Sequence, residues 1–344
     1  MRKEQIKSID FIKGICALGV LLFHFEGHYT ARYLSFFSKY FNGGILVTVF
    51  FMVSGALLWY HYADRLNLKD YALKRWKGIY PMYYIAFIPC WLLNVWRHGS
   101  FLYEGSGWAY LYTLLGIDGY LAFNTNTYHI VGEWFLGAII LMYLLFPVIR
   151  WAFLKSKWAT VAGALALYVG FYGKTITNVM EFWTVSSCLI SFCLGLLFME
   201  YRKQIISLPG ILVAAVGYIL LNVVRIPMDS NAAYHVSGIC LFILLFALGE
   251  KIMARPRLEP IFQVLSRLSY PIFLVHHVIL QVIILIWQPK PMWQIAVLVV
   301  LTIGVVLLVS KVLAVITKFV VTGFEKTGLN EENEMRFGEI TDVE

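Results

Sequence analysis

Two ionisable side chains, Lys13 and His24, bracket an almost entirely apolar run near the start of the sequence. In a helix this spacing corresponds to about 16 Å along the axis and a rotation of about 1100°, which is close to three full turns. Both side chains would therefore lie on one face of a helix. A lysine there can hold an anionic group, and a histidine can act as a general base or as a nucleophile.

Each of these residues also has an ordinary structural interpretation. A lysine near the end of a membrane helix can extend its ammonium group to the lipid headgroups, and a lone histidine at the interface is often a hydrogen-bonded polar group. Ionisable groups inside a membrane are nevertheless candidates for function by default. Because Lys13 and His24 would share a face, we favour the interpretation that they line one passage.

The composition places these residues in an integral membrane protein. Of the 344 residues, 60% are hydrophobic and only 14% are charged, whereas a soluble domain is about half apolar and about a quarter charged. We interpret the apolar stretch 108–123 as interfacial or re-entrant because glycines and an aspartate interrupt it. A membrane-spanning helix needs about 20 apolar residues, so we predict an all-α bundle of about ten transmembrane helices, at 9–26, 44–62, 79–96, 133–150, 158–173, 182–200, 208–224, 235–252, 268–287 and 293–320.

The distribution of basic residues predicts the orientation of this bundle. Most lysines and arginines fall in the loops on the side that holds both termini, and cytoplasmic loops are enriched in these residues. We therefore expect both termini in the cytoplasm, Lys13 near the cytoplasmic face and His24 toward the outer face. We expect a transmembrane domain over 1–325 and a short polar cytoplasmic tail over 326–344.

Further polar residues in or beside the spans are candidates for the same passage. The run FFMVSG places Ser54 in the second span, where small residues commonly serve close helix packing. Lys74, Arg75 and Lys77 precede the third span, in what we predict to be a cytoplasmic loop. They are either ordinary positive charges of that side or an anion-binding site. Tyr80 follows them as a candidate lining residue.

The fourth span begins with Glu133 and Trp134, toward the outer side. A base such as His24 needs a partner that orients its ring, and Glu133 is our candidate; the ordinary interpretation is an exposed interfacial carboxylate. Trp134 is a candidate lining residue. The ninth span contains two adjacent histidines, His276 and His277. Adjacent residues point about 100° apart on a helix, so we do not expect these two to act on one face.

Taken together, these stretches resemble the membrane acyltransferase family 3, whose members are bacterial and lysosomal O- and N-acyltransferases. The family's first-helix motif is an arginine, ten residues and a histidine, which is similar to Lys13 through His24 with lysine in place of arginine. The runs FFMVSGALL, KRWKGIYPMYY, WFLGAIILMYLLFP and LSYPIFLVHH are similar to further family segments, in the same order. Gly78 stands where the family has an arginine before IYP, and Ile139 and Ile140 stand where one branch has paired glutamates.

The resemblance implies acyl-CoA, most often acetyl-CoA, as the donor substrate and a hydroxyl acceptor on a cell-surface sugar, polysaccharide or lipid-linked glycan. Lys13 and the basic segment around Arg75 would hold the CoA phosphates, while His24 would act as a general base or carry a transient acyl group. No metal is expected. The expected location is the plasma membrane, with membrane lipid as a partner and no nucleic acid. Glycan-biosynthesis proteins or a second copy of the chain stay open as partners.

Two other classes of function stay open at this point. A transporter or flippase for a glycolipid or small solute would also be a multi-span bundle, often with inverted repeats; the sequence shows glycine-interrupted spans and no evident repeat. A haem protein would need histidines on facing helices at matched depths. We expect His24 near the outer end of its span, whereas His276 and His277 lie in the middle of theirs, so this reading is disfavoured.

Overall fold

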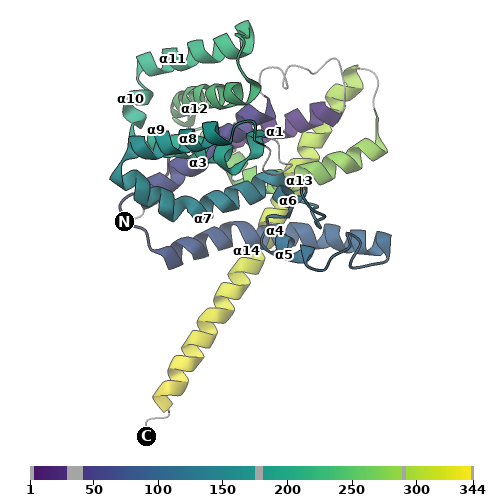
Figure 1. Ribbon diagram of the computed structural model, residues 1–344. Helices are drawn as coiled ribbons and strands as arrows, with labels where there is room; N and C mark the ends of the chain where they lie inside the picture. Colours follow the sequence, from purple (N-terminus) through teal and green to yellow (C-terminus); the bar gives the residue numbers. More distant parts are fainter. Residues whose placement is uncertain (1–3, 29–41, 175–180, 289–291, 342–344) are drawn as a thin grey trace.

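The computed structural model describes residues 4–28, 42–174, 181–288 and 292–341, and within these ranges all regular secondary structure is helical (Figure 1). The expectation of an all-α membrane bundle is confirmed at this level. Seven of these helices are long and apolar enough to cross a membrane: α1 (Lys7–His28), α3 (Gly43–Tyr62), α4 (Leu68–His98), α7 (Glu133–Lys155), α12 (Ser230–Met253), α13 (Glu259–Ile286) and α14 (Met292–Thr341, apolar over Trp293–Gly323).

Three shorter apolar helices lie at the remaining predicted spans. They are α8 (Lys157–Phe171), α9 (Val185–Glu200) and α11 (Leu208–Ile219), which continues as a π-helical turn over Leu220–Val224. Each regular helix is shorter than the about 20 residues that a full crossing needs. The count of ten spans and the cytoplasmic placement of the termini therefore stay predictions.

Helix α4 corrects the loop that we expected between the second and third spans. The side chain of Asn67 accepts a hydrogen bond from the backbone N–H of Asp70 (3.1 Å) and caps a helix that continues to His98. An asparagine cap and an acidic residue in the first turn both stabilise the start of a helix. The basic residues of this segment therefore lie on a helix that leads directly into the membrane span.

Helix α14 continues past the expected end of the membrane domain. Figure 1 shows it extending away from the rest of the bundle, and it reaches Thr341, beyond the boundary predicted at 325. Residues 342–344 lie outside the described residues. The division of the chain into 1–325 and 326–344 stays a prediction.

The segment between α4 and α7 contains only short helices. These are α5 (Ala109–Leu114) and α6 (Asp118–Leu121), and neither is long enough to cross a membrane. Gly116, with φ of +68°, makes the turn between them, a conformation that glycine adopts without strain. The rings of Tyr110 and Tyr128 stack with their centroids 3.9 Å apart, which fixes this segment against the chain that leads into α7.

Helix α1 lies inside the bundle, where it packs against α3, α12 and α13 (Figure 1). Two glycines allow α3 and α9 to approach closely. Gly55 of α3 faces the backbone of Phe192, and Gly195 of α9 faces the backbone of Met52. A Cβ atom at either glycine would overlap the opposing carbonyl. Small residues are the usual means of such close approach in membranes, so these two glycines let α3 and α9 pack backbone to backbone.

Candidate active site

A cavity of about 900 Å³ lies among α1, α3, α4, α7 and α13. Lys13 and His24 both line it, which places these two residues on one face of α1. Helix α13 accompanies α1 along the cavity: Ser266 donates to Asp10 (2.6 Å) near the start of α1, and His276 lies beside His24 near its end. The cavity therefore has a Lys13 end and a His24 end.

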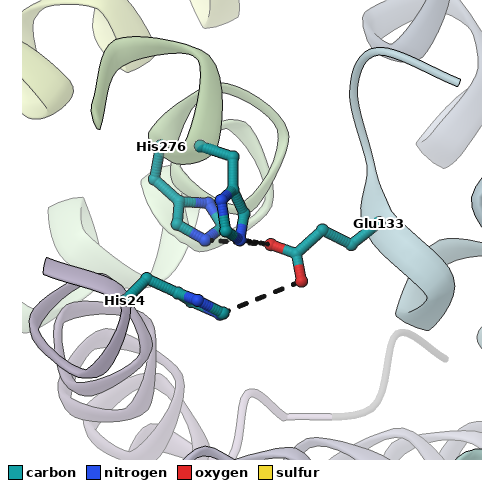
Figure 2. A group of neighbouring side chains, drawn as sticks. His24, Glu133 and His276 are labelled. Carbon is teal, nitrogen blue, oxygen red and sulfur yellow. Dashed lines mark ion pairs between the residues drawn. The ribbon is translucent and has the colours of Figure 1, made fainter. Parts of the chain in front are cut away.

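Three histidines converge on one carboxylate at the His24 end (Figure 2). Oε1 of Glu133 lies 2.6 Å from Nε2 of His277 and 3.1 Å from Nε2 of His276. Oε2 of Glu133 lies 3.8 Å from Nε2 of His24. The ring centroids of His24 and His277 are 4.2 Å apart. One carboxylate oxygen thus faces α1 and the other faces α13.

The protonation of His276 follows from its hydrogen bonds. Its Nδ1 lies 2.9 Å from the carbonyl oxygen of Phe273 and 3.1 Å from that of Ile272. Because a carbonyl oxygen only accepts, Nδ1 carries a proton, so Nε2 presents a lone pair whenever the ring is neutral. That lone pair is directed toward Glu133. The ring is completely enclosed, with no exposed surface.

Backbone geometry sets the position of Glu133. It is the first residue of α7 and has φ of +36°, directly after Gly132 with φ of +90°. A non-glycine residue at positive φ is strained, and such strain concentrates at functional sites. A Cβ atom on Gly119 would lie 2.7 Å from the carbonyl oxygen of Glu133 and 2.8 Å from Cε1 of His129. Glycine at 119 therefore lets α6 pack directly against the backbone of Glu133.

A second polar layer lies behind Glu133. Asp118 is buried and accepts hydrogen bonds from Tyr83 Oη (3.2 Å), Thr113 Oγ1 (3.1 Å) and the Gly119 N–H (2.9 Å). Burial raises the pKa of Asp118, against the opposing effect of the neighbouring His129, and burial lowers the pKa of His129, against the opposing effect of Asp118. The neutral forms of both groups are thus favoured by their surroundings.

A smaller cavity of about 310 Å³ borders the same cluster, between the chain that leads into α7 and helices α4 and α13. Its lining includes Asn94, His129 and Gln281. Glu133 and His277 line both this cavity and the large one. The histidine–glutamate cluster therefore separates two spaces.

The Lys13 end presents positive charge to the large cavity. Lys13 lies near enough to the Asp10 carboxylate to interact with it electrostatically, without a close ion pair in the described part of the chain. Arg75 also lines the cavity; its Nε is buried without a hydrogen bond, and its guanidinium lies 5.4 Å from the ring centroid of Tyr143. Lys74 and Lys77, predicted to join the same anion site, are exposed and lie outside the cavity lining. They point away because they occupy other faces of α4.

Of the three residues predicted to line the passage, two line the cavity and one does not. Ser54 lines the cavity, as does Trp134, whose ring stacks on that of Trp183 with centroids 4.9 Å apart. Tyr80 is not part of the cavity lining; its hydroxyl donates instead to the carbonyl oxygen of Leu115 (2.9 Å). Its prediction as a lining residue is therefore not supported by its position, because α4 turns it toward α5.

From the sequence we did not expect His276 and His277 to act together, and this prediction was wrong. Two side chains that diverge by about 100° can still reach an atom that lies between them, and Oε1 of Glu133 occupies that place. The two histidines also lie at the depth of His24 rather than at a different one. The tandem pair in LSYPIFLVHH was the available signal.

Comparison with models of protein families matched residues 6–311 to the family described as "Acyltransferase domain", acyltransferase family 3. The match begins before α1 and ends within α14, so it includes every residue of the two cavities. Searches of curated proteins and of solved structures found no match.

Proposed function

The chain belongs to acyltransferase family 3 and is a multi-pass membrane acyltransferase; from this premise we propose that it moves an acyl group, acetyl by preference, from cytoplasmic acyl-CoA to a hydroxyl group of a cell-surface sugar, polysaccharide or lipid-linked glycan. The observation that carries the proposal is the single cavity with cationic residues at one end and the His24–Glu133 cluster at the other. The proposed location is the plasma membrane, with both termini in the cytoplasm.

The Lys13 end supports a cytoplasmic, anionic donor. Lys13 and Arg75 both line the cavity, and Nε of Arg75 makes no hydrogen bond in the described part of the chain. Charge-assisted hydrogen bonds to phosphate are among the strong polar contacts in proteins. The two residues would hold phosphates of CoA. Helical spacing sets the Lys13–His24 separation at about 16 Å, a distance that the pantetheine arm can cover.

The His24 end supports the transfer step. Nε2 of His24 removes the proton of the acceptor hydroxyl, whose oxygen attacks the thioester carbonyl. The C–S bond breaks, and the imidazolium returns the proton to the departing CoA sulfur. Glu133 orients the ring and stabilises its cationic form, as the carboxylate of a catalytic triad does. In the alternative order, His24 first takes the acyl group as an acyl-imidazole and then passes it to the hydroxyl.

The test replaces His24. Cells that lack the gene would be complemented with wild type, His24→Ala or His98→Ala, and transfer of labelled acetyl from acetyl-CoA to envelope glycans would be measured at matched membrane levels of each protein. His98 is an exposed histidine at the end of α4 and serves as the matched control. Loss of the base should lower transfer by about 10² to 10⁴-fold. Undiminished transfer with His24→Ala would exclude the mechanism.

A further inference from the structure

We propose that Glu133, His276 and His277 bind one divalent transition-metal ion, with Zn²⁺ as the best fit, directly beside His24. The inference concerns a binding site and does not depend on the identity of the acyl donor or acceptor. The sequence led us to expect no metal, and that expectation did not take into account that the tandem histidines lie beside His24.

The donor set is one that transition metals prefer. Two imidazole nitrogens and a carboxylate suit Zn²⁺ and its neighbours in the first row, whereas Mg²⁺ and Ca²⁺ favour oxygen ligands. One ligand atom from each of Glu133, His276, His277 and His24 can be chosen so that all four lie within 4.8 Å of one another. Ligands around tetrahedral zinc are separated by about 3.3 Å, given bonds of about 2.0 Å. The contacts of 3.1 and 2.6 Å need only small widening to admit an ion.

The contact between His276 and Glu133 joins two buried atoms that are both common metal ligands. Nε2 of His276 and Oε1 of Glu133 are 3.1 Å apart, and Oε1 also lies 2.6 Å from Nε2 of His277. In the neutral ring with its proton on Nδ1, Nε2 of His276 would face Oε1 as a second acceptor. A cation between them would satisfy both.

The second ring nitrogen of His276, Nδ1, makes the kind of hydrogen bond that usually orients a metal-binding histidine. Histidines that bind metal almost always donate their second ring N–H to a carbonyl or carboxylate, which fixes the ring and its tautomer. Nδ1 of His276 makes this contact with the carbonyl oxygens of Phe273 and Ile272. The completely enclosed ring therefore presents Nε2 to the cluster in a set orientation.

His24 lies next to this site without completing it. Its Nε2 is 3.8 Å from Oε2 of Glu133, farther than either histidine of α13 is from Oε1. Three protein ligands with a fourth position left open is the arrangement of catalytic zinc sites. An ion there could polarise the carbonyl of the thioester as a Lewis acid, while His24 keeps its nitrogen for the acceptor hydroxyl.

The test measures metal content rather than activity. The full chain would be purified in detergent without a polyhistidine tag and without chelators, and its metals quantified by mass spectrometry. Wild type should carry about one ion per chain, and His276→Ala and Glu133→Gln less than about a tenth of that. His24→Ala and the exposed control His98→Ala should keep the ion. Zn²⁺ should raise the melting temperature of chelator-treated wild type but not that of Glu133→Gln, which preserves side-chain size.

Two results would overturn the site. One is a wild-type protein that holds no metal and takes up neither Zn²⁺ nor Co²⁺, the latter followed by its visible absorption. The other is an equal metal content in wild type, His276→Ala and Glu133→Gln. Either result would leave the acyltransferase proposal intact, since that proposal is tested by acyl transfer in the His24→Ala protein.

Discussion

The two carboxylate oxygens of Glu133 contact histidines on two different helices. Oε2 faces His24 on α1, and Oε1 faces His276 and His277 on α13. The arrangement lets the carboxylate steady a base on one side and complete a polar cluster on the other. Its strained backbone, with φ of +36°, indicates that the position is set by the surrounding chain rather than by local preference.

At the other end of the cavity, we predict that Lys13 acts through its charge. Lys13→Ala should raise the KM for acyl-CoA by about 10 to 100-fold, because hydrogen bonds to charged groups contribute about 1.5–3 kcal/mol, and should change kcat much less. Lys13→Arg keeps the charge and should remain within a few-fold of wild type. The measurement is initial-rate kinetics with varied acyl-CoA. Lys251→Ala, at an exposed position near the end of α12, is the control.

A fall in kcat alone for Lys13→Ala, with KM unchanged, would contradict the donor-binding role. So would equal effects of Lys13→Ala and Lys251→Ala.

Among the helices, α6 and α7 approach each other closely at Gly119 of α6. We predict that Gly119→Ala lowers both acyl transfer and stability, since its Cβ would lie 2.7 Å from the Glu133 carbonyl oxygen and overpacking costs about 1–3 kcal/mol. Gly163→Ala on α8 is the matched control, because a Cβ there meets no atom within 4 Å. Thermal unfolding and transfer assays of both variants check this. If the two variants had the same melting temperature and the same acyl transfer, α6 would be able to shift without cost to make room for the added methyl group.

The helices themselves could be predicted from the sequence, but their contacts could not. Long apolar runs identify spans because lipid excludes polar residues, and the Lys13–His24 spacing placed both residues on one face. The convergence of Glu133 with His276 and His277 depends on how α7 and α13 meet in space. Likewise, α4 decides that Arg75 lines the cavity and that Tyr80 does not. No local pattern carries that information.

For the whole molecule, the residues of the candidate site end well before the chain does. The last residue on either cavity is Gln281, and the family match ends at 311. We therefore predict that removal of 326–344 leaves acyl transfer within about two-fold of wild type, since chain termini outside a functional site commonly tolerate truncation. Transfer assays at matched membrane levels test this. A large loss in kcat would show that the end of α14 supports the bundle or a partner needed for transfer.

The wall shared by the two cavities has a consequence for the cell. His129, Glu133, Phe273 and His277 line both cavities and form this wall. In the proposed orientation, a small chemical group can change compartments through that wall while the molecule that delivers it stays inside and the molecule that receives it stays outside. An activated metabolite can then decorate an exterior surface without ever being exported.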